Sequence, residues 1–426
     1  MWRNCRNLPM VDFGNFRLLC FFVRKKRMRT IAAVSITLVV AVSCGIKETG
    51  VAVNPMMDGV WVSTGMTDGV LEENPGMMTV FVYPDSFDWY GGDPARVRTS
   101  LALYDGNSPV MRLSVGDGYH VSHDPDRHWI IDGHLYTSHD KDGVMVVMKD
   151  GSTLFRYAAQ ERIVGIVVEN GHVYTLGVHY GDVGFTYRRD GVSIISKYTG
   201  NVTGSLKKDG DKICFAYSSR TITENGDEMS YFMVRDAVEE QIMLPGTVDV
   251  LWDAVSFDGE TCCIAYSSLT GEAFYYREDV MKKIGLPRFA KLQYASFIPG
   301  SCSRPCLEGV YETSSGKQLS ALWIEADEYV SIDNSLSITC ARFSDDGFGC
   351  VMNPLSDDSQ GLIIWNGDVH LMPEGYRCMG SCPIRLSGLD MTVGLSSIRG
   401  DHPLVWRNGE LDTLYVNGYI SSMSEP

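Results

Sequence analysis

The densest group of side chains that could do chemistry lies within residues 118–139, which hold five of the nine histidines of the chain. These are His120, His123, His128, His134 and His139, and Asp124 and Asp126 stand among them. Histidine and aspartate are common ligands of zinc and related ions. The histidines lack the spacing of a known metal motif, however, and His134 has a counterpart, His172, in a second copy of its local sequence. We therefore expect a solvated loop between strands here, with no metal and no cofactor.

Two pairs of cysteines have a spacing that could also serve a metal, Cys302-x-x-x-Cys306 and Cys378-x-x-x-Cys382. Together they could supply the four thiolates of a zinc site. The pairs are separated by a whole repeat of the sequence, and an exported chain can form disulfides, so we expect local disulfides or buried free thiols instead. Nine cysteines follow Cys44, and because nine is odd, at least one should stay free unless the chain dimerises through it.

Aromatic residues gather between Met66 and Ser100, which we interpret as a long insertion between two strands. They are Phe81, Tyr83, Phe87, Trp89 and Tyr90. Aromatic side chains outside a repeat can stack on a sugar or anchor a protein partner. They can equally form a flap that covers the edge of a sheet. We take Trp89 and Tyr90 as the candidate ligand contacts and keep the flap as the alternative.

Motifs for nucleophilic catalysis and phosphate binding are missing from the sequence. It contains no Gly-x-Ser-x-Gly, no Walker loop and no dinucleotide fingerprint in a βαβ setting. Only Arg277 to Lys283 hints at a helix, which is too little for an α/β domain. We assign no catalytic residue.

The first 43 residues have the features of a targeting segment. A basic run, Arg24 to Arg27, precedes the apolar stretch Ile31 to Val42, which is shorter than the roughly 20 residues of a membrane-spanning helix. Small residues then lead to Cys44, as in the bacterial lipobox, where the cysteine is lipidated and becomes the new N-terminus. We expect an N-terminal extension and lipoprotein signal peptide at 1–43, a lipidated tether at 44–57 and a folded domain at 58–426. An uncleaved membrane anchor is the alternative, and either Met1 or Met28 could be the start.

Charge is unevenly distributed between the targeting segment and the rest of the chain. The chain has 37 Lys and Arg and 53 Asp and Glu, and residues 44–426 alone carry a net charge of −23. A chain segment with so large a negative charge repels the phosphates of nucleic acids and anionic lipid headgroups. We therefore exclude nucleic acid as a partner.

The folded domain is built from a repeat. Asp209 to Ser219 and Asp258 to Ser268 match closely and align Cys214 with Cys263, which we expect in the core. Short apolar strands end in turns at regular intervals, at Gly106, Gly151, Gly191, Ala237, Val280, Ala326, Gly367 and Gly409. The period is about 43 residues, which is typical of the blades of a β-propeller. Four strands of about 5–6 residues with their connections account for that length.

Turn chemistry agrees with this interpretation, because Asp-Gly and Asn-Gly dipeptides favour tight β-hairpins. Strands such as Ile213 to Tyr217 are apolar on both faces, as expected of sheets stacked between neighbours. The C-terminal segment Gly418 to Met423 looks like the strand that would precede Gly59 to Val62. The sequence thus predicts an all-β fold with a single β-propeller of eight four-stranded blades, closed by the C-terminal strand, with seven blades as the alternative.

The Trp406-Arg407-Asn408-Gly409 and Trp365-Asn366-Gly367 turns, with the repeated Gly-x-Val-Tyr strand, resemble the β-propeller lipoproteins of Bacteroides and relatives, mostly of undefined role. The resemblance covers roughly 58–426 and implies an eight-bladed ring, but no activity. Separately, Ser122-x-Asp124-x-Asp126-x-x-Trp129 resembles the Asp-box turn of sialidase-type propellers, with an aspartate where glycine is usual. That box is a structural element even in sialidases.

The function expected from these observations is a non-catalytic binding module for protein or glycan. It would be lipid-anchored in the bacterial cell envelope, with the membrane as partner through Cys44 and an envelope protein or glycan as the possible ligand. The outer membrane is the expected site. The alternative is a carbohydrate-active enzyme with its site at the mouth of the propeller channel, where carboxylates from several blades would have to converge.

Overall fold

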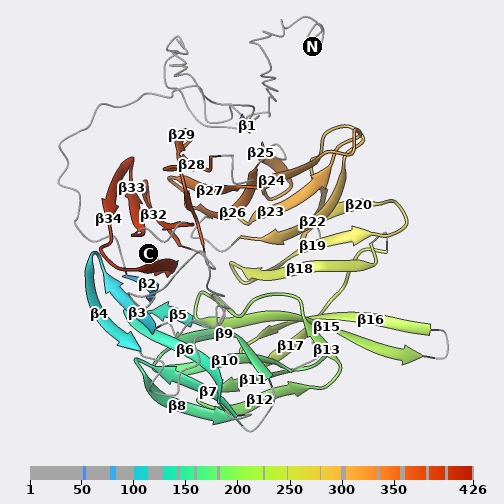
Figure 1. Cartoon of the computed structure of the whole chain (residues 1–426). Helices are drawn as coiled ribbons and strands as arrows, with labels where there is room; N and C mark the ends of the chain where they lie inside the picture. The colour runs from blue at the N-terminus through green and yellow to red at the C-terminus, as the bar shows by residue number, and fades with distance from the viewer. Residues whose placement is uncertain are drawn as a thin grey trace, which may run out of the picture.

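The computed structural model describes residues 51–53, 77–82, 100–113, 128–141, 144–157, 161–179, 183–223, 226–246, 248–278, 280–298, 304–332, 336–355, 360–379, 383–398 and 402–424. Every regular element in these ranges is a β-strand, and the strands form eight sheets arranged around a ring (Figure 1). The fold is a β-propeller with eight four-stranded blades, as the sequence predicts. In each blade the first strand lies at the centre of the ring and the fourth towards its rim, and in blade 6 a short strand from the N-terminal side of the chain, β1 (Val51–Val53), pairs with the fourth strand on its outer edge.

The first four blades follow the chain from its N-terminal side. Blade 1 contains β35 (Gly418–Met423), β2 (Met77–Val82), β3 (Ser100–Asp105) and β4 (Ser108–Leu113). Blade 2 contains β5 (His128–Ile131), β6 (His134–Lys141), β7 (Val144–Lys149) and β8 (Ser152–Tyr157). Blade 3 contains β9 (Glu161–Glu169), β10 (His172–His179), β11 (Phe185–Arg189) and β12 (Val192–Lys197). Blade 4 contains a divided inner strand, β13 (Gly200–Val202) and β14 (Lys207–Asp209), then β15 (Lys212–Thr223), β16 (Gly226–Arg235) and β17 (Val238–Ile242).

The other four blades repeat the arrangement. Blade 5 contains β18 (Val250–Phe257), β19 (Glu260–Ser267), β20 (Glu272–Arg277) and β21 (Val280–Lys283). Blade 6 contains β22 (Lys291–Phe297), β23 (Cys306–Glu312), β24 (Gln318–Ile324) and β25 (Asp327–Ile332). Blade 7 contains β26 (Leu336–Phe343), β27 (Phe348–Pro354), β28 (Leu362–Trp365) and β29 (Asp368–Leu371). Blade 8 contains β30 (Tyr376–Arg377) and β31 (Ile384–Ser387), then β32 (Asp390–Ser397), β33 (Leu404–Arg407) and β34 (Glu410–Thr413).

The C-terminal strand closes the ring by becoming the inner strand of the first blade. In β35, Ile420 pairs with Val80 of β2, and all six residues of the strand are buried. Closure is therefore confirmed, but its partner differs from our expectation, because β35 pairs with Met77–Val82. The segment Gly59 to Val62 lies outside the described residues. The interpretation of 66–100 as one continuous insertion is wrong, since β2 is a regular strand of blade 1.

The repeated turns are held by one recurring contact. A turn residue with positive φ, Asp150, accepts a hydrogen bond from the backbone N–H of Leu135 through its side chain, at 2.9 Å. The same contact joins Asp190 to Val173, Asp236 to Ile213, Asn366 to Phe348 and Asn408 to Met391. An aspartate or asparagine is needed here because it tolerates positive φ and reaches the start of the second strand. The turn between the third and fourth strands is thereby fastened to the second strand of its own blade.

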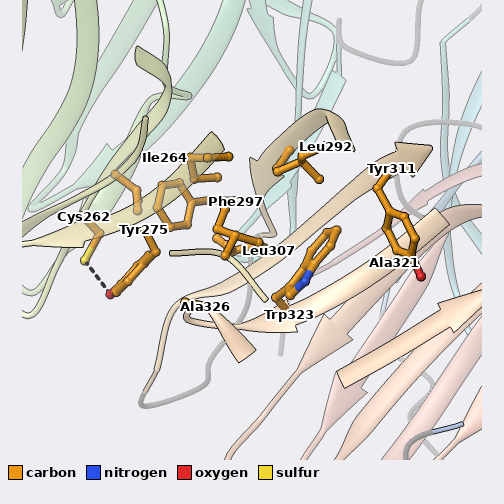
Figure 2. Close-up of a cluster of buried hydrophobic side chains, with 14 residues drawn as sticks. Cys262, Ile264, Tyr275, Leu292, Phe297, Leu307, Tyr311, Ala321, Trp323 and Ala326 are labelled. Atoms are coloured by element: carbon orange, nitrogen blue, oxygen red, sulfur yellow. Dashed lines mark hydrogen bonds between the residues drawn. The ribbon is translucent and has the colours of Figure 1, made fainter. Parts of the chain in front are cut away.

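Two turns without glycine show how the repeat tolerates change. Ala237 adopts a φ of 72°, a left-handed conformation that normally favours glycine. Ala326 stands at the equivalent position of blade 6, but there the positive φ falls on Glu325, and the Ala326 methyl group is buried. It packs in the cluster between blades 5 and 6 that Figure 2 shows around Trp323 and Tyr275. The helix suspected at Arg277–Lys283 is wrong, since these residues form the hairpin from β20 to β21.

We expect Ala237→Gly to stabilise the protein. Relief of left-handed strain, about 1–2 kcal/mol, should exceed the unfolded-state entropy of glycine, about 0.4–1 kcal/mol, for a net gain of about 0.5–1 kcal/mol. Urea denaturation measures the difference. Ala326→Gly is the matched control and should destabilise the protein, because it removes a buried methyl group. Equal effects of the two variants would contradict this account.

Ring closure predicts that β35 is as important to stability as any core strand. Ile420 packs between Val80 and Val405 of blade 8, and a Cβ on Gly394 would come within 2.5 Å of it. Ile420→Ala should therefore cost about 2–5 kcal/mol in unfolding free energy. Ile194→Ala on the exposed rim should cost well under 1 kcal/mol, since its side chain is 40% exposed. Similar losses for both variants in thermal or urea unfolding would argue against closure through β35.

Candidate functional site

The two faces of the ring differ in the connections that they carry. The turns between first and second strands and between third and fourth strands lie on one end of the blades, which we call the turn face. The connections between second and third strands, and from one blade to the next, lie on the opposite end, which we call the loop face. This follows from the antiparallel pairing within every blade.

The turn face is rich in carboxylates. Its acidic residues include Asp105, Asp132, Asp150, Asp190, Asp209, Asp211, Asp236, Asp258, Glu278, Glu325, Asp345, Asp346, Asp368 and Asp390. Several of them are structural, since Asp150 and Asp190 also bind the imidazoles of His134 and His172, at 2.7 and 2.6 Å. The predicted equivalence of His134 and His172 is thus confirmed. Each of these histidines thus belongs to the repeat, where its imidazole contacts the turn aspartate of its own blade.

The loop face also has acidic residues, among them Asp249 and Glu374, but it presents more of the large exposed apolar side chains than the turn face, where Leu389 is 56% exposed. Among the described residues, the most exposed hydrophobic ones are Leu269 (93% exposed), Tyr415 (84%) and Tyr198 (79%), and all three lie on this face. Phe289, Met243, Leu355 and Val183 are further exposed hydrophobic residues of the same face. The connections that carry Tyr198, Leu269 and Tyr415 contain no charged residue. Exposed apolar surface of this kind marks sites of interaction.

The exposed aromatic residues of the loop face are held by neighbours. The ring of Tyr198 lies 5.8 Å from that of His179, and the ring of Tyr415 lies 5.7 Å from that of His402. His402 is itself fixed, because its Nδ1 lies 3.1 Å from the Val416 carbonyl oxygen. Side chains that are ordered in advance lose less conformational entropy when a ligand binds. The loop face is therefore the candidate binding site.

The residues singled out in the sequence lie mostly outside the described part of the chain. Trp89 and Tyr90 lie outside the described residues, in the connection between Val82 of β2 and Ser100 of β3, and those two strand ends are paired on the loop face. Segment 114–127, with His120 and His123, also lies outside the described residues. The strands that flank it, β4 and β5, likewise meet it at the loop face. Sequence reasoning missed Tyr198, Leu269 and Tyr415, because a repeat pattern does not reveal which end of a blade a connection occupies.

Two of the suspected histidines are buried instead of solvated. His128 Nε2 lies 2.9 Å from Ser421 Oγ, which in turn contacts Thr79 Oγ1 at 2.9 Å. This polar cluster joins blade 2 to the closing strand of blade 1. His139 is also buried, at 4% exposure. The expectation of a wholly solvated loop across 118–139 is therefore wrong for His128 and His139.

A second buried polar group lies between blades 2 and 3. The Arg188 guanidinium contacts the carboxylate of Glu161 at 2.8 Å and lies 4.0 Å from the centre of the Tyr157 ring. Glu161 is fully buried, and a Cβ on Gly177 would collide with it, so the glycine creates the space for the carboxylate. The ion pair lies within blade 3, between β9 and β11, and the contact of Arg188 with the Tyr157 ring is the one that reaches blade 2.

The cysteines in the described residues act as core residues. Cys214 and Cys263 are buried free thiols, as predicted, and burial raises the pKa of Cys214 to about 11. Cys378 is also a buried free thiol with a pKa raised to about 12 by burial, so no local disulfide to Cys382 forms. Cys340 is disulfide-bonded. Thiols with raised pKa values are poor nucleophiles and poor metal ligands at neutral pH.

The described residues contain no cluster of three or more His, Cys, Asp and Glu side chains arranged to hold a metal ion. They also contain no helix that is long and apolar enough to cross a membrane.

One surface cleft of about 370 Å³ lies between blades 4 and 5, lined by β17 residues and by Arg235, Thr261 and Tyr276. Arg235 is fixed there by Ser256, Glu240 and Thr261.

Comparison with known proteins bears on the architecture alone. No protein-family model matches the chain, and no curated protein matches its sequence. Among solved structures, it is similar to the β-propeller domain of the Trilobed protease from Pyrococcus furiosus, with 9% identity, a TM-score of 0.44, and 70% and 93% of the two chains covered. It is similar to the dihydro-heme d1 dehydrogenase NirN, with 12% identity, a TM-score of 0.49, and coverage of 85% and 77%. It is also similar to dipeptidyl peptidase 4 of Porphyromonas gingivalis, with 10% identity, a TM-score of 0.43, and coverage of 73% and 55%.

One carboxyl group in the wall of the ring should titrate near neutral pH. Asp253 of β18 accepts hydrogen bonds from the backbone N–H of Phe297 and of Ala254, both at 2.8 Å, and so ties blade 5 to blade 6. Burial raises the pKa of Asp253 to about 6, although the two amides and Lys207 lower it. The folded protein thus favours the neutral acid relative to the unfolded chain. Its contribution to stability is complete below about pH 4 and is lost as the pH rises through 6.

We therefore expect the stability of the wild type to fall relative to Asp253→Asn between pH 4 and 6. The difference should change by about 1–3 kcal/mol, because each pKa unit corresponds to about 1.4 kcal/mol. Urea denaturation at several pH values measures it, with Asp211→Asn on the exposed turn face as the control. A constant difference across this range would show that burial of Asp253 does not perturb its titration.

Proposed function

We propose that this protein is a non-catalytic binding module of the bacterial cell envelope, anchored by a lipid on Cys44, that holds a protein or glycan on its loop face. The observation that supports it most is the gathering of exposed, positioned aromatic and aliphatic side chains on that face. A rigid ring with functional residues on its connections is a common design for recognition. Trp89 and Tyr90, predicted from the sequence as ligand contacts, follow Val82, whose strand ends at this face.

The acidic turn face supports the same arrangement. Carboxylates in the turns are hydrated and repel one another, and therefore oppose self-association of that face. They also repel an anionic lipid surface. The turn face then stays in water, while the exposed apolar side chains of the loop face are available to a partner.

A binding screen of residues 50–426 against glycans and envelope proteins tests the proposal. Replacing Tyr198, Leu269 and Tyr415 together by Ala should weaken the recovered interaction at least tenfold, because the exposed contacts are lost. Trp89→Ala with Tyr90→Ala should weaken it as well. Val192→Ala and Val280→Ala on the rim, also exposed, form the matched control and should leave it unchanged. Equal binding by all variants would place the site elsewhere.

Lipid anchoring is tested separately by metabolic labelling with a fatty-acid probe. Cys44→Ala should lose the label and leave the membrane fraction, because the thiol is the acceptor. Cys214→Ala is the control, since its thiol is buried in the folded ring, and it should keep the label. A Cys44→Ala variant that keeps both label and membrane association would exclude this mode of anchoring.

A further inference from the structure

One hairpin of the propeller extends well beyond its blade. Strands β15 and β16 are 12 and 10 residues long, and Figure 1 shows them projecting past the ring. The pairing to β13 ends at Ser219 and the pairing to β17 ends at Tyr231. Beyond these points, in the described residues, 220–223 of β15 and 226–230 of β16 pair only with the other strand of this hairpin. We call these two segments the ribbon.

The ribbon leaves two unused strand edges at the loop face. Each edge presents about five residues of backbone N–H and C=O groups, roughly 17 Å in length. A two-stranded ribbon by itself is marginally stable in water, and free edges are templates for a further strand. In the other blades the described second and third strands pair over four to seven residues, against ten in blade 4.

Apolar side chains lie along the edge of β16. Met229 is 45% exposed, and by the alternation of a strand it points to the same side as Tyr231 and Met233, which face blade 5. Met243 follows the end of β17 and is also exposed. Methionine adapts its shape to different apolar partners, which suits recognition of a peptide side chain.

The base of the ribbon is tied to the neighbouring loop of blade 5. The Tyr231 hydroxyl donates to the backbone carbonyl of Asp249 at 3.3 Å. The Asp249 carboxylate accepts from the backbone N–H of Ser268 at 2.8 Å and from its hydroxyl. These contacts position Leu269, the most exposed of the described large hydrophobic residues, beside the ribbon.

A carboxylate on the ribbon favours an extended partner segment that carries positive charge. On β16 the ribbon carries Glu228, whose side chain is exposed, and Arg220 stands on the other strand, β15. A strand that pairs along this edge is therefore favoured when it carries Lys or Arg. A glycan has no regular row of backbone N–H and C=O groups with which to pair along this edge.

We propose that the ribbon adds an extended peptide segment of a partner protein as a third strand beside β16. An apolar side chain of that segment contacts Met229, Met243 and Leu269, and a basic side chain pairs with Glu228. Recognition of this kind combines main-chain hydrogen bonds for affinity with side-chain contacts for specificity. The inference rests on the proposed binding function and names its partner as a basic, apolar extended segment.

Selection of a displayed library of random 12-residue peptides on the purified 50–426 chain tests this inference. Recovered peptides should share alternating apolar residues with Lys or Arg. Their affinity should fall at least tenfold for Met229→Asp, and for a chain in which 221–228 is replaced by Asn-Gly. Val280→Asp on the rim of blade 5 is the matched control and should bind as the wild type does. Unchanged thermal unfolding shows that the ring of the shortened variant is intact.

Three outcomes overturn the inference. These are no enrichment of peptides, peptides that bind the shortened chain equally well, and concentration-dependent dimerisation that the shortening abolishes, which would assign the edge to a second copy of the chain. Each is distinct from failure of the proposed function, because the screen with the Tyr198, Leu269 and Tyr415 variant reports on the loop face without requiring the ribbon.

Discussion

Every blade of this protein must bury both of its faces against a neighbour, and the structure depends on that constraint. A four-stranded sheet with apolar residues on both sides is insoluble alone, so the eight sheets can be stable only as a closed ring. Closure in turn requires a strand from one end of the chain to complete a sheet begun at the other. Strand β35 meets this requirement by pairing with β2, and its burial on all sides shows how completely it has become part of the core.

Turn hydrogen bonds, glycines and buried polar contacts all help the blades to stack against one another. The Asp and Asn side chains in the turns between third and fourth strands bond to the second strand, and so hold each blade flat enough to stack. Glycines such as Gly394 allow neighbouring blades to approach closely at the centre. Where the interface is polar, as for His128 with Ser421 or Glu161 with Arg188, each buried group contacts a partner from its own or the adjacent blade.

A ring built in this way places different demands on the connections of its two faces. The turn face is specified by tight hairpins, which demand Asp, Asn and Gly, and it is therefore acidic as a consequence of folding. The loop face has no such demand, so its connections are free to vary in length and composition. Exposed Tyr198, Leu269 and Tyr415, and the projecting ribbon, all arise from this freedom. The asymmetry gives the proposed binding function a physical basis, because only one face can change without damage to the fold.

The sequence by itself determined the fold class, the repeat and the number of blades, because hairpin turns leave a strong local signal at a period of about 43 residues. Of the eight turn positions named from the pattern, seven lie between third and fourth strands, even where Ala237 replaces glycine, and Val280 begins the fourth strand β21. The insertion assigned to 66–100 failed because β2 has a weak pattern next to aromatic residues, and pairing with β35 over more than 300 positions leaves no local trace. The prediction that His128 is solvated failed for the same reason. Only the tertiary structure decided which connections share a face, since that depends on strand direction in space and not on composition.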